Sequence, residues 1–186
     1  DIELRKQQRD ALQVDDCIVI GHIGRFCEPK NHKRLLEIFS ELSHRNEKYR
    51  LVLIGSGNME CEIRKKIEEL NLEKKVFLLG QIEKAYLKLN MFDVLLFPSL
   101  YEGFPTVLLE AQANGLPSVI SANITPTIAI TDLIKFQSLQ NDDKKWAQTI
   151  EEHIKARTNT SVYNQKITEK YDVLYVAHEY EKIYSE

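Results

Sequence analysis

Short apolar runs that alternate with helical segments limit the folds open to this chain more than any other feature. The runs cover residues 17–23, 51–54, 76–79, 94–97 and 116–121. The segments between them favour helices, at 31–45, 59–70, 83–89 and 106–114. Strands that are apolar throughout and separated by helices are typical of a parallel sheet covered on both faces. The sequence therefore predicts the α/β class, a Rossmann-like parallel sheet with helices on both faces.

The pattern loosens after residue 121. Three threonines and one proline in the segment 123–131 indicate a loop. We expect a last strand at 134–139, and a helix from 142 to about 155 that turns Trp146 and Ile150 inward. The segments 158–170 and 173–184 are also expected to be helical.

Composition excludes several classes of function. The chain has 186 residues and a formal net charge of -3, so it suits one domain with a real core and carries no basic stripe for nucleic acid. No apolar run approaches the ~20 residues that span a bilayer. Cys17, Cys27 and Cys61 show no metal-ligand spacing and favour a reducing compartment. No Asp-x-Asp pair is present to hold a metal ion.

Right-handed crossovers place the carboxyl ends of parallel strands on one edge of the sheet, where ligands bind. Four turn-forming residues mark these ends: Gly24, Gly55, Gly80 and Pro98. Arg25 follows the first strand and offers a planar fork for phosphate oxygens, while Lys30 offers a compact charge beside a helix start. A plain surface role is the alternative for both, since exposed basic residues are common. Asn31 is expected to cap the helix that follows.

The segment 101–110 carries the most specific pattern, with two carboxylates eight positions apart. Pro105 suits a first helical turn, and the free amides of that turn attract anions. Glu110 would lie about 7.5 Å further along the helix at 1.5 Å per residue, within reach of a ribose diol if a diphosphate sits at the helix start. Glu102 would lie on the other side of the phosphates, beside a sugar. These features together suit a nucleotide sugar.

Two glycine turns and one histidine complete the predicted edge. The turn at Gly55 lets a ligand approach the backbone, although it lacks the third glycine of a dinucleotide fingerprint. The main chain at Gly80 and the side chain of Gln81 are candidates for bonding the edge of a base. A simple strand-to-helix turn is the alternative at both places. His22, at the end of the first strand, is a further candidate for ligand contact.

From residue 18 to residue 121 the chain resembles the C-terminal, donor-binding domain of retaining GT-B glycosyltransferases with a Glu-x7-Glu motif, in particular enzymes of bacterial capsule and exopolysaccharide assembly. The resemblance implies that Arg25 and Lys30 bind the diphosphate, that Glu110 binds the ribose hydroxyls, and that Glu102 contacts the transferred sugar. Arg25, Lys30 and Glu102 are thus the expected catalytic residues. The remaining donor-binding positions that it implies are Gly24, Gly55, Gly80, Gln81, Gly103, Phe104, Pro105, Thr106 and Val107. One departure is the loop 122–127, which lacks the Gly-Gly turn of many relatives.

The resemblance also implies that a second half is missing. Residues 1–13 would be the tail of an interdomain linker, 14–170 the nucleotide-sugar-binding domain, and 171–186 a helix that packs on an absent N-terminal domain. That domain would hold the acceptor, a glycan or a lipid-linked glycan. The expected function is retaining transfer of a hexose from a nucleoside diphosphate, UDP by family frequency, without cofactor or metal. This chain alone would then be inactive. We expect it in the cytoplasm, or held at the inner face of the membrane through the missing half.

Two other functions remain open at this point. A glycan phosphorylase of the GT-B type would need a lysine that binds pyridoxal, for which Lys30 and Lys33 are poor candidates. A non-catalytic α/β module that binds nucleotides would need only the phosphate and base contacts. Binding of nucleoside diphosphates, and pyridoxal absorbance in the complete protein, would separate these functions.

Overall fold

The computed structural model describes residues 1–157 and residue 167. The described residues form one parallel sheet of six strands in the order β3-β2-β1-β4-β5-β6. The strands are β1 (Ile18–Ile23), β2 (Tyr49–Ile54), β3 (Val76–Leu78), β4 (Val94–Phe97), β5 (Ser118–Ser121) and β6 (Ile134–Gln137). The predicted Rossmann-like sheet is therefore confirmed. The chain leaves β1 in one direction through β2 and β3, and then returns to β4 on the other side, so the switch point lies between β1 and β4.

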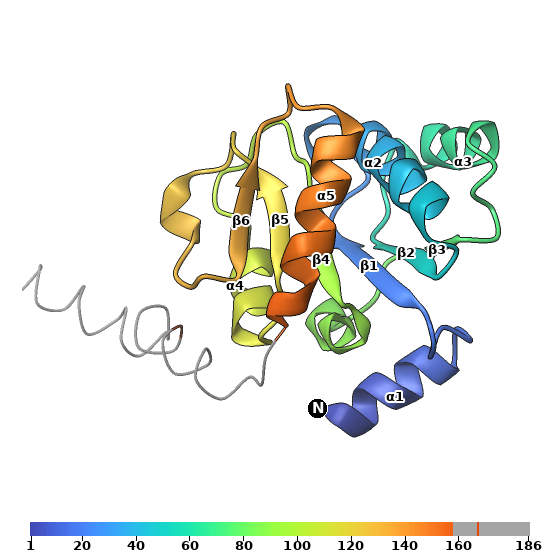
Figure 1. The fold of residues 1–186 in the computed structure, drawn as a ribbon, viewed down its shortest axis with the longest axis horizontal. Coiled ribbons are helices and arrows are strands. Elements are labelled where there is room, and N and C mark those ends of the chain that lie inside the picture. Colours follow the sequence, from blue (N-terminus) through green and yellow to red (C-terminus); the bar gives the residue numbers. More distant parts are fainter. Residues whose placement is uncertain (158–166, 168–186) are drawn as a thin grey trace, which may run out of the picture.

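Helices cover both faces of this sheet. The α-helices are α1 (Ile2–Asp10), α2 (His32–Arg45), α3 (Glu60–Glu69), α4 (Thr106–Ala113) and α5 (Asp143–His153). Shorter 3-10 helices are η1 (Glu28–Lys30), η2 (Ala85–Met91), η3 (Pro126–Ile128) and η4 (Ile154–Ala156). Figure 1 shows α2 and α5 side by side over one face, with α4 on the other side of the sheet. The helices expected at 158–170 and 173–184 lie outside the described residues, apart from residue 167.

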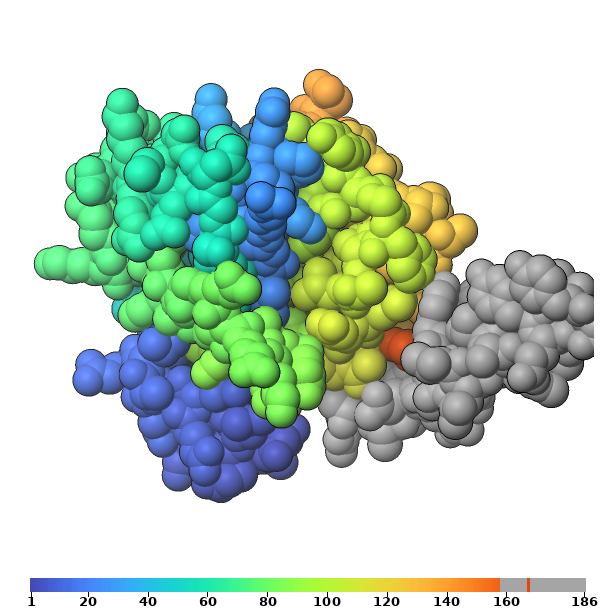
Figure 2. All heavy atoms as spheres, turned by 180° about the vertical axis from the view of Figure 1, so that it is seen from behind, coloured from blue at the N-terminus to red at the C-terminus, as the bar shows by residue number. Residues whose placement is uncertain are grey.

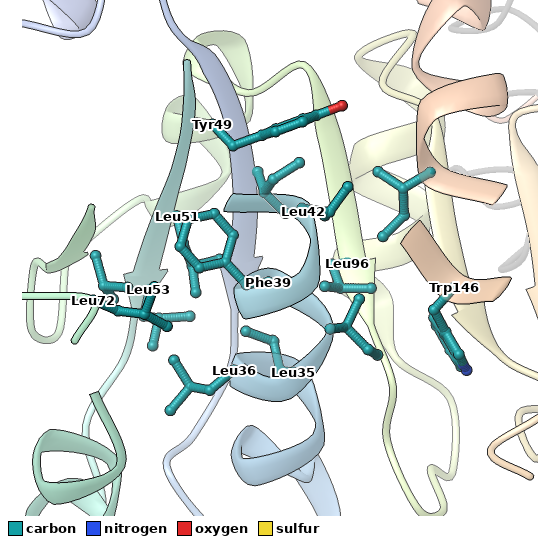
Figure 3. Close-up of a cluster of buried hydrophobic side chains, with 14 of the residues drawn as sticks. Leu35, Leu36, Phe39, Leu42, Tyr49, Leu51, Leu53, Leu72, Leu96 and Trp146 are labelled. Carbon is teal, nitrogen blue, oxygen red and sulfur yellow. The ribbon is translucent and has the colours of Figure 1, made fainter. Parts of the chain in front are cut away.

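One apolar core joins the sheet to α2, α3 and α5. Leu35, Leu36 and Phe39 of α2 recur at helical spacing and are fully buried against strand residues such as Leu51 and Leu53, as Figure 3 shows. Each fully buried side chain of this kind contributes about 1.5–3 kcal/mol relative to an exposed one. Trp146 of α5 is also fully buried, as predicted, and its indole nitrogen donates a 2.9 Å hydrogen bond to the Ser138 carbonyl.

A second core lies on the opposite face, between the sheet and α4 with η2. Val19, Val52 and Leu95 point to this face because they alternate with the first core's residues along their strands. The short helix α4 ends at Ala113 with Asn114 as its C-cap, and Gly115 then takes the left-handed conformation that often follows a helix, with a φ of +67°. Helices therefore cover both faces of the sheet and exclude water from them. The ends of the strands remain available to a ligand.

A buried glutamine on α4 holds the loop that follows β5. Gln112 is fully buried, and its amide nitrogen donates to the carbonyls of Leu108 and Ile128. Its carbonyl oxygen accepts bonds from the backbone amides of Ile130 and Thr131, each at 3.0 Å. This one side chain thereby satisfies several polar groups of a loop that the sequence analysis identified only by its composition.

Helix α1 was not predicted, because residues 1–13 were interpreted as linker. The Asp1 side chain caps it by accepting a bond from the Leu4 amide at 3.0 Å. Arg5 and Arg9 then extend from α1 to the carboxylate of Asp93, just before β4. Asp93 also accepts a 2.7 Å bond from the Val19 amide of β1. Long-range charge pairs therefore hold α1 against the start of the two central strands.

Candidate functional site

The carboxyl ends of β1 and β4 bring two loops together at the switch point. The Leu100 amide donates to the Pro29 carbonyl at 2.8 Å, and the Asn31 side chain donates to the Pro98 carbonyl at 3.0 Å. Asn31 occupies the N-cap position of α2, as predicted, but its side chain makes no capping bond and bridges to the other loop instead. The two loops carry Lys30 and Glu102, and these bonds hold them in a fixed relation.

Two of the three predicted catalytic residues meet directly. The Lys30 ammonium lies 2.8 Å from a carboxylate oxygen of Glu102, and the two side chains are only 16% and 12% exposed. The same ammonium lies 4.5 Å from the centre of the Phe97 ring, a cation–π distance. A largely buried ion pair of this kind has given up most of its hydration, so a ligand that replaces either partner must supply equivalent bonds.

Arg25, the third predicted catalytic residue, is exposed and lines a cavity of about 490 Å³. Gly55, Ser56, Gly57 and Gln81 form the rest of its lining. Three of the predicted donor-binding positions, from the ends of β1, β2 and β3, thus share one concave surface. Figure 2 shows this region from behind, with light-blue atoms of the β1–α2 region between the teal and the yellow-green parts of the molecule.

The glycine turns of this edge form a row of backbone contacts. The Gly24 amide donates to the Ile54 carbonyl, and the Gly55 amide donates to the Gly80 carbonyl, both at 2.9 Å. Gly55 has a φ of +145°, and a β-carbon there would lie 1.9 Å from the Gly24 carbonyl oxygen. Only glycine fits such a position. The turn at Gly55 therefore brings the β1 and β2 ends into direct contact and leaves the backbone open to the cavity.

The loop before α4 presents the other predicted donor-binding positions. Pro105 precedes the helix, which begins at Thr106 and continues through Val107. The amides of a first helical turn have no partner within the helix and are suited to an anion. Gly103 has open space where a β-carbon would be, and the side chains of Tyr101 and Phe104 are 65% and 46% exposed. The backbone of this loop is accordingly accessible.

Glu110 lines a different cavity from that of Arg25. This cavity, of about 450 Å³, lies between α4, η2 and the start of α1, and its lining includes Tyr86, Leu87, Leu89 and Asn90. Loss of water beside these walls raises the pKa of the Glu110 carboxyl, although the residue as a whole remains exposed. Figure 2 shows the green atoms of η2 between α1 and the yellow-green α4. Among the described residues none lines both cavities, so Glu110 does not share the cavity of Arg25.

Buried histidines lie directly behind the Lys30–Glu102 pair. His22 is fully buried and His32 is 2% exposed, with ring centres 4.9 Å apart. Burial and the neighbouring charges of His32 and Lys30 hold the pKa of His22 well below its usual range, and burial with Lys30 lowers the pKa of His32 to about 4. The sequence analysis proposed His22 for ligand contact and overlooked His32. The available signal was its position: His32 is the first residue of α2, two residues after Lys30.

The sheet order and the loops at its switch point define the class to which this domain belongs. Solved structures with the same arrangement are GT-B glycosyltransferases, which establishes the fold. They include Anabaena Alr3699/HepE in complex with UDP and glucose, at a TM-score of 0.83 and 18% identity over 100% of this chain and 52% of that one. WaaG, a glycosyltransferase involved in lipopolysaccharide biosynthesis, aligns at a TM-score of 0.77 and 16% identity over 97% of this chain and 50% of that one.

A family model for glycosyl transferases group 1 matches residues 5–170, so the chain belongs to this family. The putative glycosyltransferase EpsF of Bacillus subtilis is 43% identical over 136 residues, which are 73% of this chain and 35% of EpsF. An N-acetylgalactosaminyltransferase that acts on a diphospho-undecaprenol substrate in Campylobacter jejuni is 36% identical over 115 residues, 60% of this chain and 30% of that enzyme. The chain thus spans about a third of the length of these relatives. Within the part that the structure describes, no helix has both the length and the apolar character to cross a membrane.

Proposed function

We propose that this chain is the donor-binding part of a retaining glycosyltransferase and binds a nucleoside diphosphate sugar, with UDP-hexose as the first candidate. The observation that carries the proposal is the meeting of Lys30 and Glu102 at the switch point, 2.8 Å apart and beside the turn that bears Arg25. Cations for a diphosphate and a carboxylate for sugar hydroxyls are thereby adjacent, at the edge where ligands bind in open α/β sheets. The solved complex of HepE with UDP and glucose, a structure of the same fold, supports this choice of ligand.

In this proposal the Lys30–Glu102 pair opens when the donor enters. The sugar hydroxyls donate to Glu102, and the Lys30 ammonium turns to the diphosphate together with Arg25 and the first amides of α4. Cleavage of the sugar–phosphate bond leaves more negative charge on the diphosphate, so these cations bind the departing group more strongly than the ground state. Glu110 would accept bonds from the ribose hydroxyls. The acceptor, a growing polysaccharide or lipid-linked glycan, would be held by the part of the relatives that this chain does not span.

Three free thiols support the cytoplasm as the compartment: Cys17, Cys27 and Cys61. The curated relatives favour polysaccharide assembly as the setting. A capsular polysaccharide biosynthesis glycosyltransferase of Staphylococcus aureus is 27% identical over 88% of this chain.

Calorimetric titration of the purified protein with UDP, GDP and ADP tests the proposal. We expect UDP to bind, and Glu110→Gln to weaken it by about 1–2 kcal/mol through loss of a charged hydrogen bond. Glu152→Gln, on the α5 face of the sheet, is the matched control and should leave the affinity unchanged. Failure of all three nucleotides to bind at millimolar concentration would refute donor binding. Binding of UDP with equal affinity to both variants would move the ribose contact away from Glu110.

A further inference from the structure

His22 lies between the predicted donor site and the core, and its contacts define its chemical state. The residue is on β1, and its ring stacks on that of Phe97 of β4 with centres 5.2 Å apart. The ring nitrogen Nδ1 lies 3.0 Å from the Leu96 carbonyl oxygen. A carbonyl oxygen only accepts, so Nδ1 carries the proton and donates it. A neutral His22 therefore has its lone pair on Nε2.

That lone pair has no hydrogen-bond partner among the residues that the structure describes, although Nε2 is completely buried. A buried acceptor without a partner costs about 1–3 kcal/mol and calls for an explanation. The Lys30 side chain is a flexible donor on the same side of the ring. A β-carbon built on Gly24 would lie 3.2 Å from His22 Nε2 and 3.1 Å from Lys30 Cε. Both the His22 acceptor and the end of the Lys30 side chain therefore lie next to the α-carbon of Gly24.

The other side of His22 is closed by aromatic rings. His32 meets it edge to face, and Phe26 meets His32 in the same way, with ring centres 4.9 Å apart in both cases. Both ring nitrogens of His32 also lack partners within the described part of the chain. Lys30 and His32 are the charged or titratable groups that act on His22, and both disfavour a second positive charge there. His22 is accordingly kept neutral and able to accept.

Lys30 has three N–H donors, and one of them bonds to the Glu102 carboxylate. If a sugar takes over Glu102, as the proposed function requires, the ammonium must find another acceptor inside a largely buried site. A diphosphate oxygen can take one or two of the N–H bonds. The remaining one needs an uncharged acceptor on the protein side.

We propose that His22 is a positioning residue for Lys30: its Nε2 accepts a hydrogen bond from the ammonium group when the donor separates Lys30 from Glu102. This inference rests on the proposed function. In the free protein the ammonium stays with Glu102, above Phe97. In the donor complex, the bond to His22 holds Lys30 against the Gly24 turn and directs its other N–H groups to the diphosphate. His32 and Phe26 support the imidazole from behind.

A matched pair of substitutions tests this role. Glutamine places an acceptor oxygen near the position of Nε2, whereas asparagine, one carbon shorter, can replace only the Nδ1 bond to Leu96. UDP-glucose binding is measured by calorimetry for wild type, His22→Gln and His22→Asn, with thermal unfolding recorded for each. We expect His22→Asn to weaken binding by about tenfold, the scale of one hydrogen bond to a charged group, and His22→Gln to restore most of that loss.

The same pair in a Lys30→Met background separates positioning from a merely structural effect. If His22 acts through Lys30, the two variants bind UDP-glucose equally once the ammonium is removed. Nitrogen NMR of labelled histidine gives a second readout: His22 should show the Nδ1–H tautomer, with an Nε2 signal that shifts on UDP-glucose addition in wild type but not in Lys30→Met. Equal affinities of the Gln and Asn variants with Lys30 present, or an Nε2–H tautomer, would overturn the inference. Absence of any UDP-glucose binding by wild type would instead refute the proposed function.

Discussion

Acidification should weaken this protein through His32, and the effect can be worked out from its surroundings. His32 is 2% exposed, and its two ring nitrogens have no hydrogen-bond partner in the described residues. Burial first, and the Lys30 charge second, lower its pKa from 6.5 to about 4. In the unfolded chain the ring regains water and the ordinary value. The folded state therefore binds fewer protons than the unfolded state between these two pH values.

The sign and size follow from this difference. Stability rises with pH wherever the unfolded state binds more protons, so the contribution of His32 is complete above about pH 6.5 and is lost as the pH falls toward about 4. One proton over this interval amounts to about 3 kcal/mol of unfolding free energy, taken at 1.36 kcal/mol per pKa unit. His22 acts in the same direction, since its pKa is also lowered. Replacement of His32 by phenylalanine keeps a ring between Phe26 and His22 and removes the titrating group.

Urea unfolding followed by circular dichroism, from about pH 7.5 to about pH 4.5, measures the effect. The wild-type protein should lose stability more steeply than His32→Phe, and the difference in unfolding free energy between the two should change by most of about 3 kcal/mol over this pH range. His44→Phe, at an exposed position of the same helix, controls for loss of a histidine as such. Parallel curves for wild type and His32→Phe would show that His32 titrates normally in the folded protein, and would refute the reasoning from burial.

Two further predictions concern the backbone of the site and the anchoring of α1. Gly55→Ala should destabilise the protein by at least about 2 kcal/mol, because the φ of Gly55 is +145° and a β-carbon would collide with the Gly24 carbonyl. Gly103→Ala is the control: Gly103 has open space around it, so this substitution should change the melting temperature little. Arg9→Met should cost about 3–5 kcal/mol in urea unfolding, because it leaves the Asp93 carboxylate short of a buried partner. A loss below about 1 kcal/mol would show that Arg5 alone neutralises Asp93.

The sheet was predictable because its signals are local. Each apolar run between turn residues became a strand within a few residues of its expected bounds, and 94–97 matched β4 without change. A short segment that is apolar at every position is suited to a strand buried on both faces of a sheet, so its structure can be predicted from the segment alone. Helix α1 was missed for the opposite reason. Its apolar spacing is poor, and what holds it is the pairing of Arg5 and Arg9 with a carboxylate more than eighty residues away, which no local pattern reveals.

The sequence predicted which edge of the sheet carries the candidate site, but it did not predict the contacts between the side chains there. Strand order alone brings Lys30 and Glu102 to the switch point, but their 2.8 Å ion pair depends on bonds between the two loops, such as that from Asn31 to Pro98. The rise of a helix predicts how far Glu110 lies along α4, but not the face it occupies. That face turns to η2 and its apolar side chains. The roles of these residues toward a donor stay predictions.

The attachment of α1 has a mechanical consequence. Asp93 joins both arginines of this helix to the backbone amide of Val19, so a force on α1 is carried directly by the amino-terminal ends of β1 and β4. Those two strands bear, at their far ends, the turn with Gly24 and the loop with Glu102. Strands are stiff along their length. A displacement of α1 would therefore reach the edge that carries the candidate site as a shift of one strand past its neighbour.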